Sequence, residues 1–190
     1  FMETIGVERA SLIGHSMGGF LSLDAAINFP ERVDKLVVED GVGLARGFPR
    51  RYRLLTFPLL GEILMLPMTK ANVRRGMRRS FYDPDFVTSE IVEVSYQFLR
   101  LPGAKQALLN ILRSNKGVSG PNVDEIISSK LRSVKSPTLI IHGAQDSVIS
   151  LAGAEEASNL IPDVRLKIFE ECGHCPHIEK ASEFNETVIA

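Results

Sequence analysis

Residues 14–19, with the sequence G-H-S-M-G-G, strongly restrict the folds open to this chain. They follow a short apolar run, Ala10 to Ile13, and precede a stretch rich in helix formers, Phe20 to Asn28. The segment predicts a strand, a tight turn and a helix, with Ser16 at the turn, and it fits the G-x-S-x-G pattern of a nucleophile elbow. Such a turn strains the serine backbone and needs small neighbours, which the glycines supply.

Two later segments each place a polar residue directly after a predicted strand. The apolar, β-branched run Pro137 to Gly143 is followed by Asp146, and the run Val164 to Phe169 is followed by His174. Functional groups in open parallel sheets gather at the carboxyl ends of the strands. A serine nucleophile needs a histidine base, and that base needs an orienting acid. Ser16, Asp146 and His174 occur in the chain order that this arrangement requires.

On the segments G-H-S-M-G-G, P-T-L-I-I-H-G-A-Q-D and G-H-C-P-H-I-E-K, the chain resembles the carboxyl-terminal two-thirds of an α/β-hydrolase of the esterase and lipase type. The resemblance is most secure over residues 5–42 and 134–190. It implies an α/β fold in which helices flank a mostly parallel sheet.

The same resemblance implies a role for each site residue. Ser16 is expected to be the nucleophile, His174 the general base, Asp146 its orienting acid, and the Met17 N–H one donor of the oxyanion hole. No metal or organic cofactor is expected. Haloalkane dehalogenases and epoxide hydrolases are similar in pattern but carry aspartate where this chain has Ser16.

Three other residues compete for these roles. Asp40 follows a predicted strand, Lys35 to Val38, and is the alternative acid; we favour Asp146 because its strand and loop match the pattern better. His15 is interpreted as a packing residue of the elbow. His177 is interpreted as a residue at the start of the last helix rather than as the base.

The two cysteines of the chain, Cys172 and Cys175, flank His174 in a spacing that also occurs in metal and redox sites. With His177 they offer four donors within six residues, which cannot easily surround one tetrahedral zinc ion, and no second ligand pair occurs elsewhere. A redox C-x-x-C is expected at the opening of a helix after the first strand of its own unit. We therefore expect no metal or redox function here.

The amino-terminal part of the resembling fold has no counterpart in this sequence. A complete α/β-hydrolase has about eight strands, and the loop after the third strand supplies the second oxyanion N–H. We expect the first four strands to be missing, which leaves the Ser16 strand at a sheet edge. We interpret the chain as a fragment that is incomplete and inactive alone; the alternative is that another chain supplies the missing half. Loss of one oxyanion donor costs roughly 2.7–4 kcal/mol of transition-state stabilisation.

The chain divides into three predicted regions. Residues 1–42 and 134–190 form the hydrolase core, and residues 43–133 form a helical cap insertion with amphipathic spacing at Ile91, Val94, Phe98 and Leu101. The apolar run Leu54 to Met68 is interpreted as a lid or cap helix, because two prolines, a glycine and a glutamate interrupt it.

The predicted cap is basic. It holds 15 Lys and Arg against 7 Asp and Glu, whereas the whole chain has a net charge of −1. We interpret the pairs Arg74-Arg75 and Arg78-Arg79 as solvated faces or contacts with the acidic core. The alternative is guidance of anionic substrates or contact with anionic lipid. Nucleic-acid binding is not expected, because no such motif occurs and the overall balance is not basic.

No apolar run reaches the roughly 18–20 residues of a membrane span, so a membrane span is not expected. Cytoplasmic localisation is expected, although a leader cannot be judged from this sequence, and the oligomeric state stays open.

The function expected from the sequence is hydrolysis of a small-molecule carboxylic ester with a hydrophobic acyl or aryl part through an acyl-enzyme. The alternative in the same class is hydrolysis of a carbon–carbon bond in dienoic diketo acids, whose carboxylates the basic cap could bind. A perhydrolase, a thioesterase and a non-catalytic protein on the same fold stay open as well.

Overall fold

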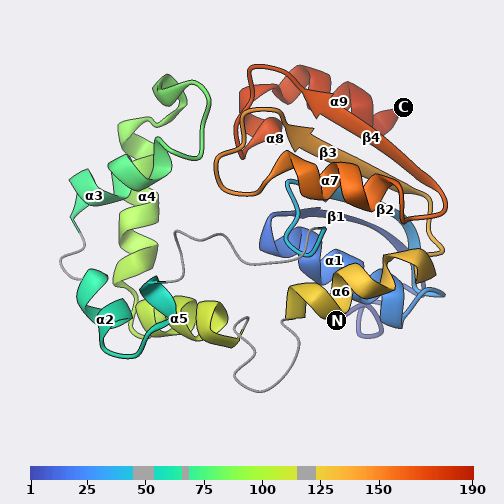
Figure 1. Ribbon diagram of the computed structural model, residues 1–190, viewed down its shortest axis with the longest axis horizontal. Coiled ribbons are helices and arrows are strands. Elements are labelled where there is room, and N and C mark those ends of the chain that lie inside the picture. Colours follow the sequence, from blue (N-terminus) through green and yellow to red (C-terminus); the bar gives the residue numbers. More distant parts are fainter. Residues whose placement is uncertain (45–53, 66–68, 115–122) are drawn as a thin grey trace.

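The structure, a computed structural model, describes residues 1–44, 54–65, 69–114 and 123–190. Its centre is a four-stranded sheet in the order β1-β2-β3-β4, and every neighbouring pair is parallel. The strands are β1 (Ala10–His15), β2 (Val33–Glu39), β3 (Thr138–Gly143) and β4 (Val164–Phe169) (Figure 1). The predicted α/β fold with a mostly parallel sheet is therefore confirmed.

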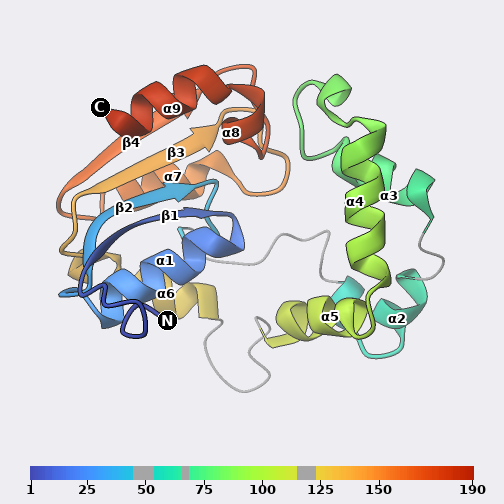
Figure 2. The ribbon, with the colours of Figure 1, turned by 180° about the vertical axis from the view of Figure 1, so that it is seen from behind.

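Helices cover both faces of the sheet (Figures 1 and 2). One face carries α1 (Met17–Asn28), α6 (Val123–Lys130) and α7 (Leu151–Ser158), and the other carries α8 (Pro176–Glu179) and α9 (Ala181–Ile189). The strands read as continuous apolar runs because their alternate side chains enter two different cores.

Neighbouring residues of β2 illustrate the two cores. Leu36 and Val38 pack in the core that includes Leu23 of α1, whereas Val37 packs with Phe184 of α9. Within the described strands, β1 lies at one edge of the sheet. Ile13 on this strand is 57% exposed, in line with the expectation that the Ser16 strand forms an edge.

A second group of helices lies beside the sheet (Figures 1 and 2). It consists of α2 (Leu60–Leu64), α3 (Lys70–Met77), α4 (Ser89–Arg100) and α5 (Ala104–Ser114), with a 3-10 turn, η2 (Pro84–Phe86), between α3 and α4. Threonines cap two of them: the Thr69 hydroxyl accepts from Asn72 N and the Thr88 hydroxyl from Ile91 N. Among the described residues, no helix combines the length and apolar character needed to cross a membrane.

This helical group has its own small core, which also contacts the sheet domain. Val73, Phe81, Val87 and Val92 are buried together, and Ile178 of α8 packs against them. The helical group is thus attached to the segment that follows β4.

The residues of the predicted amphipathic spacing do not form the buried face of α4. Val94, Phe98 and Leu101 are 48%, 63% and 54% exposed and Ile91 is half-buried, whereas the buried residue of this helix is Val92. The apolar run predicted as a lid contains α2, and its residues 66–68 lie outside the described part of the chain.

The last helix of the predicted insertion packs with the sheet domain rather than with the other cap helices. Ile127 of α6 is 3% exposed and Leu131 of the following turn, η3 (Leu131–Ser133), is fully buried, and both contact the core under β2 and β3. The helices that lie together beside the sheet are therefore α2 to α5, while α6 belongs to the layer of α1.

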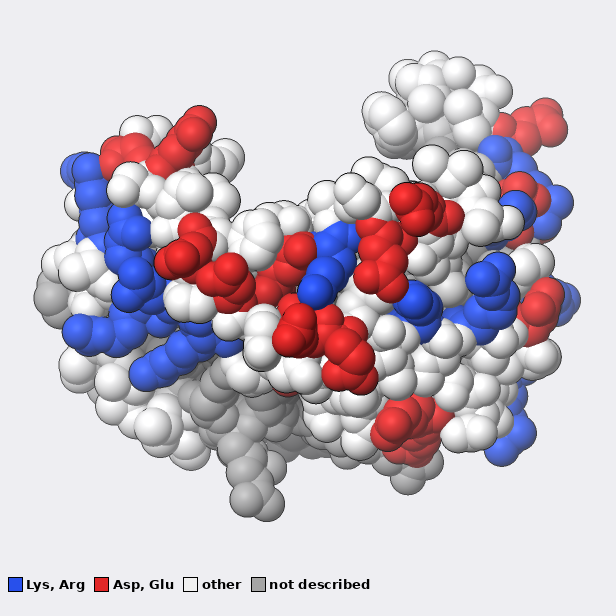
Figure 3. Space-filling model, turned by 90° about the horizontal axis from the view of Figure 1, so that it is seen from above, with Lys and Arg blue, Asp and Glu red and all other residues white. Residues whose placement is uncertain are grey.

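Basic side chains gather at the end of the molecule formed by α2 to α5, on the left in Figure 3. Arg75, Arg78 and Arg79 on and after α3 are exposed. Arg74 has a structural role, because its guanidinium donates to Val87 O at 2.9 Å and to the Ser89 hydroxyl at 3.0 Å.

Candidate active site

Ser16 lies at the sharp turn between β1 and α1. Its φ of 53° and ψ of −114° are strained for a residue with a Cβ atom. Its N–H donates to Glu39 O at 2.9 Å, and its carbonyl accepts from Val42 N at 3.1 Å. A side chain at Gly14 would meet Gly18 O at 2.2 Å, so the turn closes only over a glycine. The backbone thus has the geometry of a nucleophile elbow.

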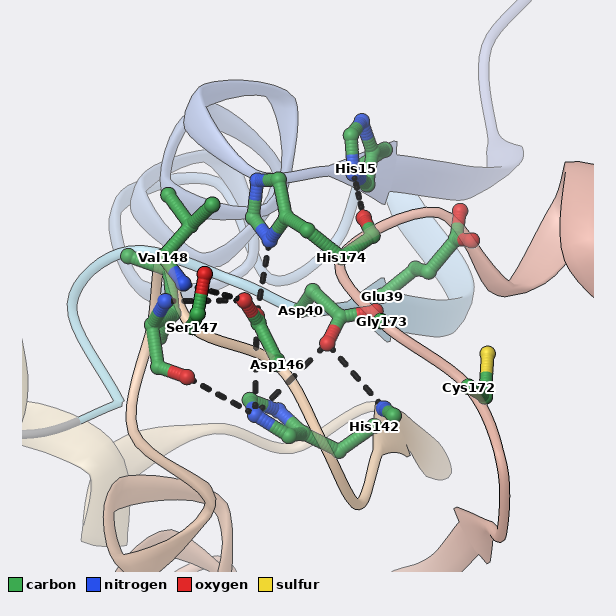
Figure 4. A network of polar contacts seen from close by, with 12 residues as sticks. His15, Glu39, Asp40, His142, Asp146, Ser147, Val148, Cys172, Gly173 and His174 are labelled. Carbon is green, nitrogen blue, oxygen red and sulfur yellow. Dashed lines mark hydrogen bonds and ion pairs between the residues drawn. The ribbon is translucent and has the colours of Figure 1, made fainter. Parts of the chain in front are cut away.

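Asp146 and His174 form a close pair, although 28 positions separate them in the sequence (Figure 4). His174 Nδ1 lies 2.7 Å from Asp146 Oδ2. The other carboxylate oxygen accepts from Val148 N at 2.5 Å and from Ile149 N at 3.1 Å. Burial raises the pKa of Asp146, but the hydrogen bonds from His174 and Val148 outweigh it and hold that pKa below its usual value. Asp146 is thus an ionised, immobilised carboxylate.

The main chain holds His174 between the helical group and the elbow. Its N–H donates to Ser80 O at 2.6 Å, and its carbonyl lies 2.6 Å from His15 Nε2. The His15 and His174 rings are 4.7 Å apart between centroids. His174 therefore lies beside the residue that precedes Ser16.

The structure brings two members of the expected triad into direct contact and the third into their neighbourhood. Within the described residues, no side-chain hydrogen bond joins Ser16 to His174. Catalytic hydrogen bonds are often loose in a protein without substrate and tighten when substrate binds. Met17 is the first residue of α1, so its N–H lies at the positive end of the helix.

His15 and His177 occupy positions different from that of His174. Burial, followed by the neighbouring His174, lowers the pKa of His15, as suits an uncharged packing residue. His177 is the second residue of α8. Its Nδ1 and its N–H both contact Glu39 Oε1, at 2.7 and 2.9 Å respectively. This hydrogen bond to Glu39 raises the pKa of His177. His177 thus pairs with Glu39 and not with Asp146.

Asp40, the alternative acid, does not contact His174. It is fully buried, and its Oδ1 accepts from Gly143 N at 3.1 Å. His142 Nε2 lies 3.6 Å from this oxygen and 3.8 Å from Asp146 Oδ2. One ligand atom from each of Asp40, His142 and Asp146 falls within 4.8 Å of the others, a spacing that a metal ion could bridge. Asp146 is hydrogen-bonded to His174, Asp40 Oδ1 accepts from a backbone N–H, and His142 Nε2 donates to Ile149 O.

The cysteines beside His174 are free thiols in the structure. Burial, and then the charge of Glu179, raises the pKa of both, to about 12 for Cys175. Neither has the electropositive surroundings of a reactive thiolate. The arrangement gives no support to a redox role.

Three buried polar residues of this region were not foreseen from the sequence: Glu39, His142 and Glu179. Glu179 Oε1 accepts from Gly173 N at 2.8 Å and its Oε2 from Tyr82 N at 2.7 Å, so this carboxylate joins the histidine loop to the helical group. The sequence offered only a weak signal for these residues. Glu39 ends an apolar strand, and Glu179 lies within the segment G-H-C-P-H-I-E-K that contains His174.

Comparisons with known proteins agree with this geometry. The family model described as alpha/beta hydrolase fold matches residues 1–181. The chain therefore belongs to the α/β-hydrolase fold family, and the resemblance inferred from the sequence is confirmed at that level.

Individual relatives are more specific. The chain is 32% identical over 192 residues to a 2-hydroxymuconate semialdehyde hydrolase of Pseudomonas putida, a match that covers 98% of this chain and 63% of that protein. It is 31% identical to a 2-hydroxy-6-oxo-6-phenylhexa-2,4-dienoate hydrolase of Comamonas testosteroni, with 99% and 64% covered. A solved structure of a meta-cleavage product hydrolase variant from Pseudomonas fluorescens IP01 is also similar, with a TM-score of 0.77, 25% identity, and 99% and 66% covered. The chain thus spans about 63% of the length of the first of these relatives.

Proposed function

We propose that this chain carries the nucleophile, base and acid of a serine hydrolase that cleaves a carbon–carbon bond in a 2-hydroxy-6-oxo-dienoic acid. The observation that carries the proposal is the coincidence of two findings. A strained Ser16 lies beside a buried Asp146–His174 pair, and relatives of 31–32% identity over nearly the whole chain are named as hydrolases of such dienoates.

The proposed roles follow from the positions of the side chains. Asp146 keeps the imidazole of His174 in the tautomer with the proton on Nδ1, which leaves Nε2 free to take the Ser16 proton. The Met17 N–H at the start of α1 stabilises the oxyanion that forms when Ser16 attacks a carbonyl.

The bond change can be balanced with these groups and water alone. The proton of the 2-hydroxyl group first moves to carbon 5 of the substrate, which leaves a ketone at carbon 2. Ser16 attacks the 6-oxo carbonyl and gives its proton to His174. The bond between carbons 5 and 6 then breaks, its electron pair passes into the 2-oxo enone, and the resulting dienolate takes the proton from His174. Water, deprotonated by His174, then releases the acyl group from Ser16 as a carboxylic acid, and the other product is a 2-hydroxydienoic acid.

The charge of the helical group suits such a substrate. Dienoic acids are anionic, and the exposed Arg75, Arg78 and Arg79 raise the local potential. The hydroxyl of Ser147, next to Asp146, donates to Arg79 O, so this basic segment approaches the proposed site.

Ester hydrolysis, the reaction favoured by the sequence alone, uses the same three side chains. An ester needs no prior proton transfer to carbon, and its alcohol is a better leaving group than an enolate. We place it second because the relatives named above act on dienoates.

The test compares the chain with its Ser16→Ala variant on 2-hydroxy-6-oxo-6-phenylhexa-2,4-dienoate and on a p-nitrophenyl ester. The proposal would be supported if the parent chain, but not Ser16→Ala, removes the dienoate absorbance and releases benzoate. Turnover of the ester without benzoate release would favour ester hydrolysis.

A fluorophosphonate, which reacts with activated serines, provides a test that is independent of the substrate. A single adduct on the parent chain and none on Ser16→Ala is expected in intact mass spectra. A folded parent chain without an adduct and without turnover would contradict both functions for this chain.

A further inference from the structure

Asp40 is the most deeply buried carboxyl group near the proposed site. It lies directly after β2 and has no exposed surface. Its Oδ1 accepts from Gly143 N, while its Oδ2 receives no hydrogen bond within the described structure. An ionised carboxylate buried without a donor on one oxygen is costly. A protonated carboxyl group would carry its hydrogen on that oxygen.

The neighbouring groups do not compensate a negative charge on Asp40. His142 Nε2 is the nearest basic atom, but it lies 3.3 Å from the carbonyl of Ile149, to which it donates. Burial lowers the pKa of His142, so its imidazole is neutral. No ion pair with Lys or Arg reaches Asp40 among the described residues.

Asp146 competes with Asp40 for the single negative charge of this cluster. Asp146 is held by two backbone N–H groups and by His174, all of which stabilise its ionised form. Two adjacent buried carboxyl groups cannot both be charged without a large repulsive cost. The charge therefore resides on Asp146 and the proton on Asp40.

We propose that Asp40 is a positioning residue, a neutral carboxylic acid whose O–H donates to the carboxylate of Asp146 and so fixes the group that orients His174. The inference rests on the proposed function of the Asp146–His174 pair. With this bond, Asp146 accepts hydrogen bonds from Val148, Ile149, His174 and Asp40, which uses the roughly four acceptor positions of a carboxylate.

The electrostatics of the site agree with this assignment. Burial, and then the charge of Asp146, raises the pKa of Asp40 to about 10. A hydrogen bond with Asp40 is among the contacts that lower the pKa of Asp146. The titratable groups around Asp40 come from its own strand, from β3 with its loop, and from the loop after β4: Glu39, His142, Asp146, Cys172, His174 and Cys175.

The test uses Asp40→Asn, whose amide keeps a donor, and Asp40→Ala, which removes it. The infrared spectrum of the parent chain at neutral pH is expected to contain a carboxylic acid band that disappears in Asp40→Asn. The rate of fluorophosphonate labelling of Ser16 is expected to fall about 10- to 100-fold in Asp40→Ala, the range found when groups supporting a site are lost. Asp40→Asn is expected to recover most of that loss.

The pH dependence separates positioning from mere packing. Ionisation of Asp40 near pH 10 would place a second charge beside Asp146, so labelling of the parent chain is expected to decline there, while Asp40→Asn lacks this decline. The absence of the infrared band, or equal damage in both variants, would overturn the proposal. A band or labelling rate that changes with a chelator would assign the cluster to a metal ion instead.

Failure of the proposed function gives a different result. A parent chain whose Ser16 is never labelled argues against serine catalysis, while the infrared band still decides where the proton lies. If Asp40→Ala does not fold, the comparison of the parent with Asp40→Asn in the spectrum and at alkaline pH retains the test.

Discussion

Gly143→Ala tests whether the packing behind the histidine loop holds the proposed site together. A methyl group at Gly143 would lie 1.9 Å from Gly173 O and 2.7 Å from Cys172 O, both backbone atoms. Contacts of a Cβ atom below 3.0 Å essentially do not occur, so Gly173 would have to move by about 1.1 Å. The backbone angles of Gly143 do not require glycine, so the steric overlap is the only cost.

The displacement is large enough to affect the site as well as stability. Gly173 precedes His174, and a shift of about 1.1 Å carried to the ring would lengthen the His174–Asp146 contact from 2.7 Å to about 3.8 Å, beyond hydrogen-bond range. Overpacking of this kind costs about 1–3 kcal/mol of unfolding free energy. With a urea dependence of about 2 kcal/mol per molar, the midpoint is expected to fall by about 0.5–1.5 M.

Urea unfolding and fluorophosphonate labelling measure the two effects separately. Gly76→Ala is the matched control, because a methyl group there meets nothing within 4 Å in α3, and alanine raises helix stability by up to about 1 kcal/mol. An unchanged midpoint together with unchanged labelling in Gly143→Ala would refute the packing argument.

Three further predictions concern the surrounding polar groups. Glu179→Gln is expected to lower the unfolding free energy by about 1–3 kcal/mol in urea, because one of the amides of Tyr82 and Gly173 would then face an NH₂ group; equal stability would contradict this. Cys172 is expected to resist iodoacetamide in the native protein and to react after unfolding, because burial raises its pKa, and native alkylation seen by mass spectrometry would count against it. The raised pKa of His177 means that its ion pair stabilises the folded state fully below about pH 6.5, the unperturbed value, and less as pH rises through the folded pKa. The stability advantage of the parent over His177→Gln, measured in urea from pH 5 to 9, should therefore shrink with rising pH, and a constant difference would oppose the assignment.

Local patterns were sufficient to predict the sheet. The run Val164 to Phe169 forms a strand with the predicted bounds, and the strand ending near Ile13 extends only two residues further. Continuous apolar runs bounded by turns carry this information because both faces of a parallel strand are buried. Such patterns could not predict that α6 packs on the sheet and not with the cap helices, because an amphipathic helix can pack equally well on either.

The sequence by itself determined the strand–turn–helix at Ser16, the parallel sheet and the order of Ser16, Asp146 and His174, since each follows from an apolar run and the polar residue that comes directly after it. Only the tertiary structure decided which acid meets which histidine. Asp40 and Asp146 both follow buried strands, yet His174 pairs with Asp146, and His177 pairs with Glu39. The choice depends on distances of a few ångströms between loops from different strands, and on which carboxyl group receives backbone donors. These quantities arise only when the sheet and its loops have packed.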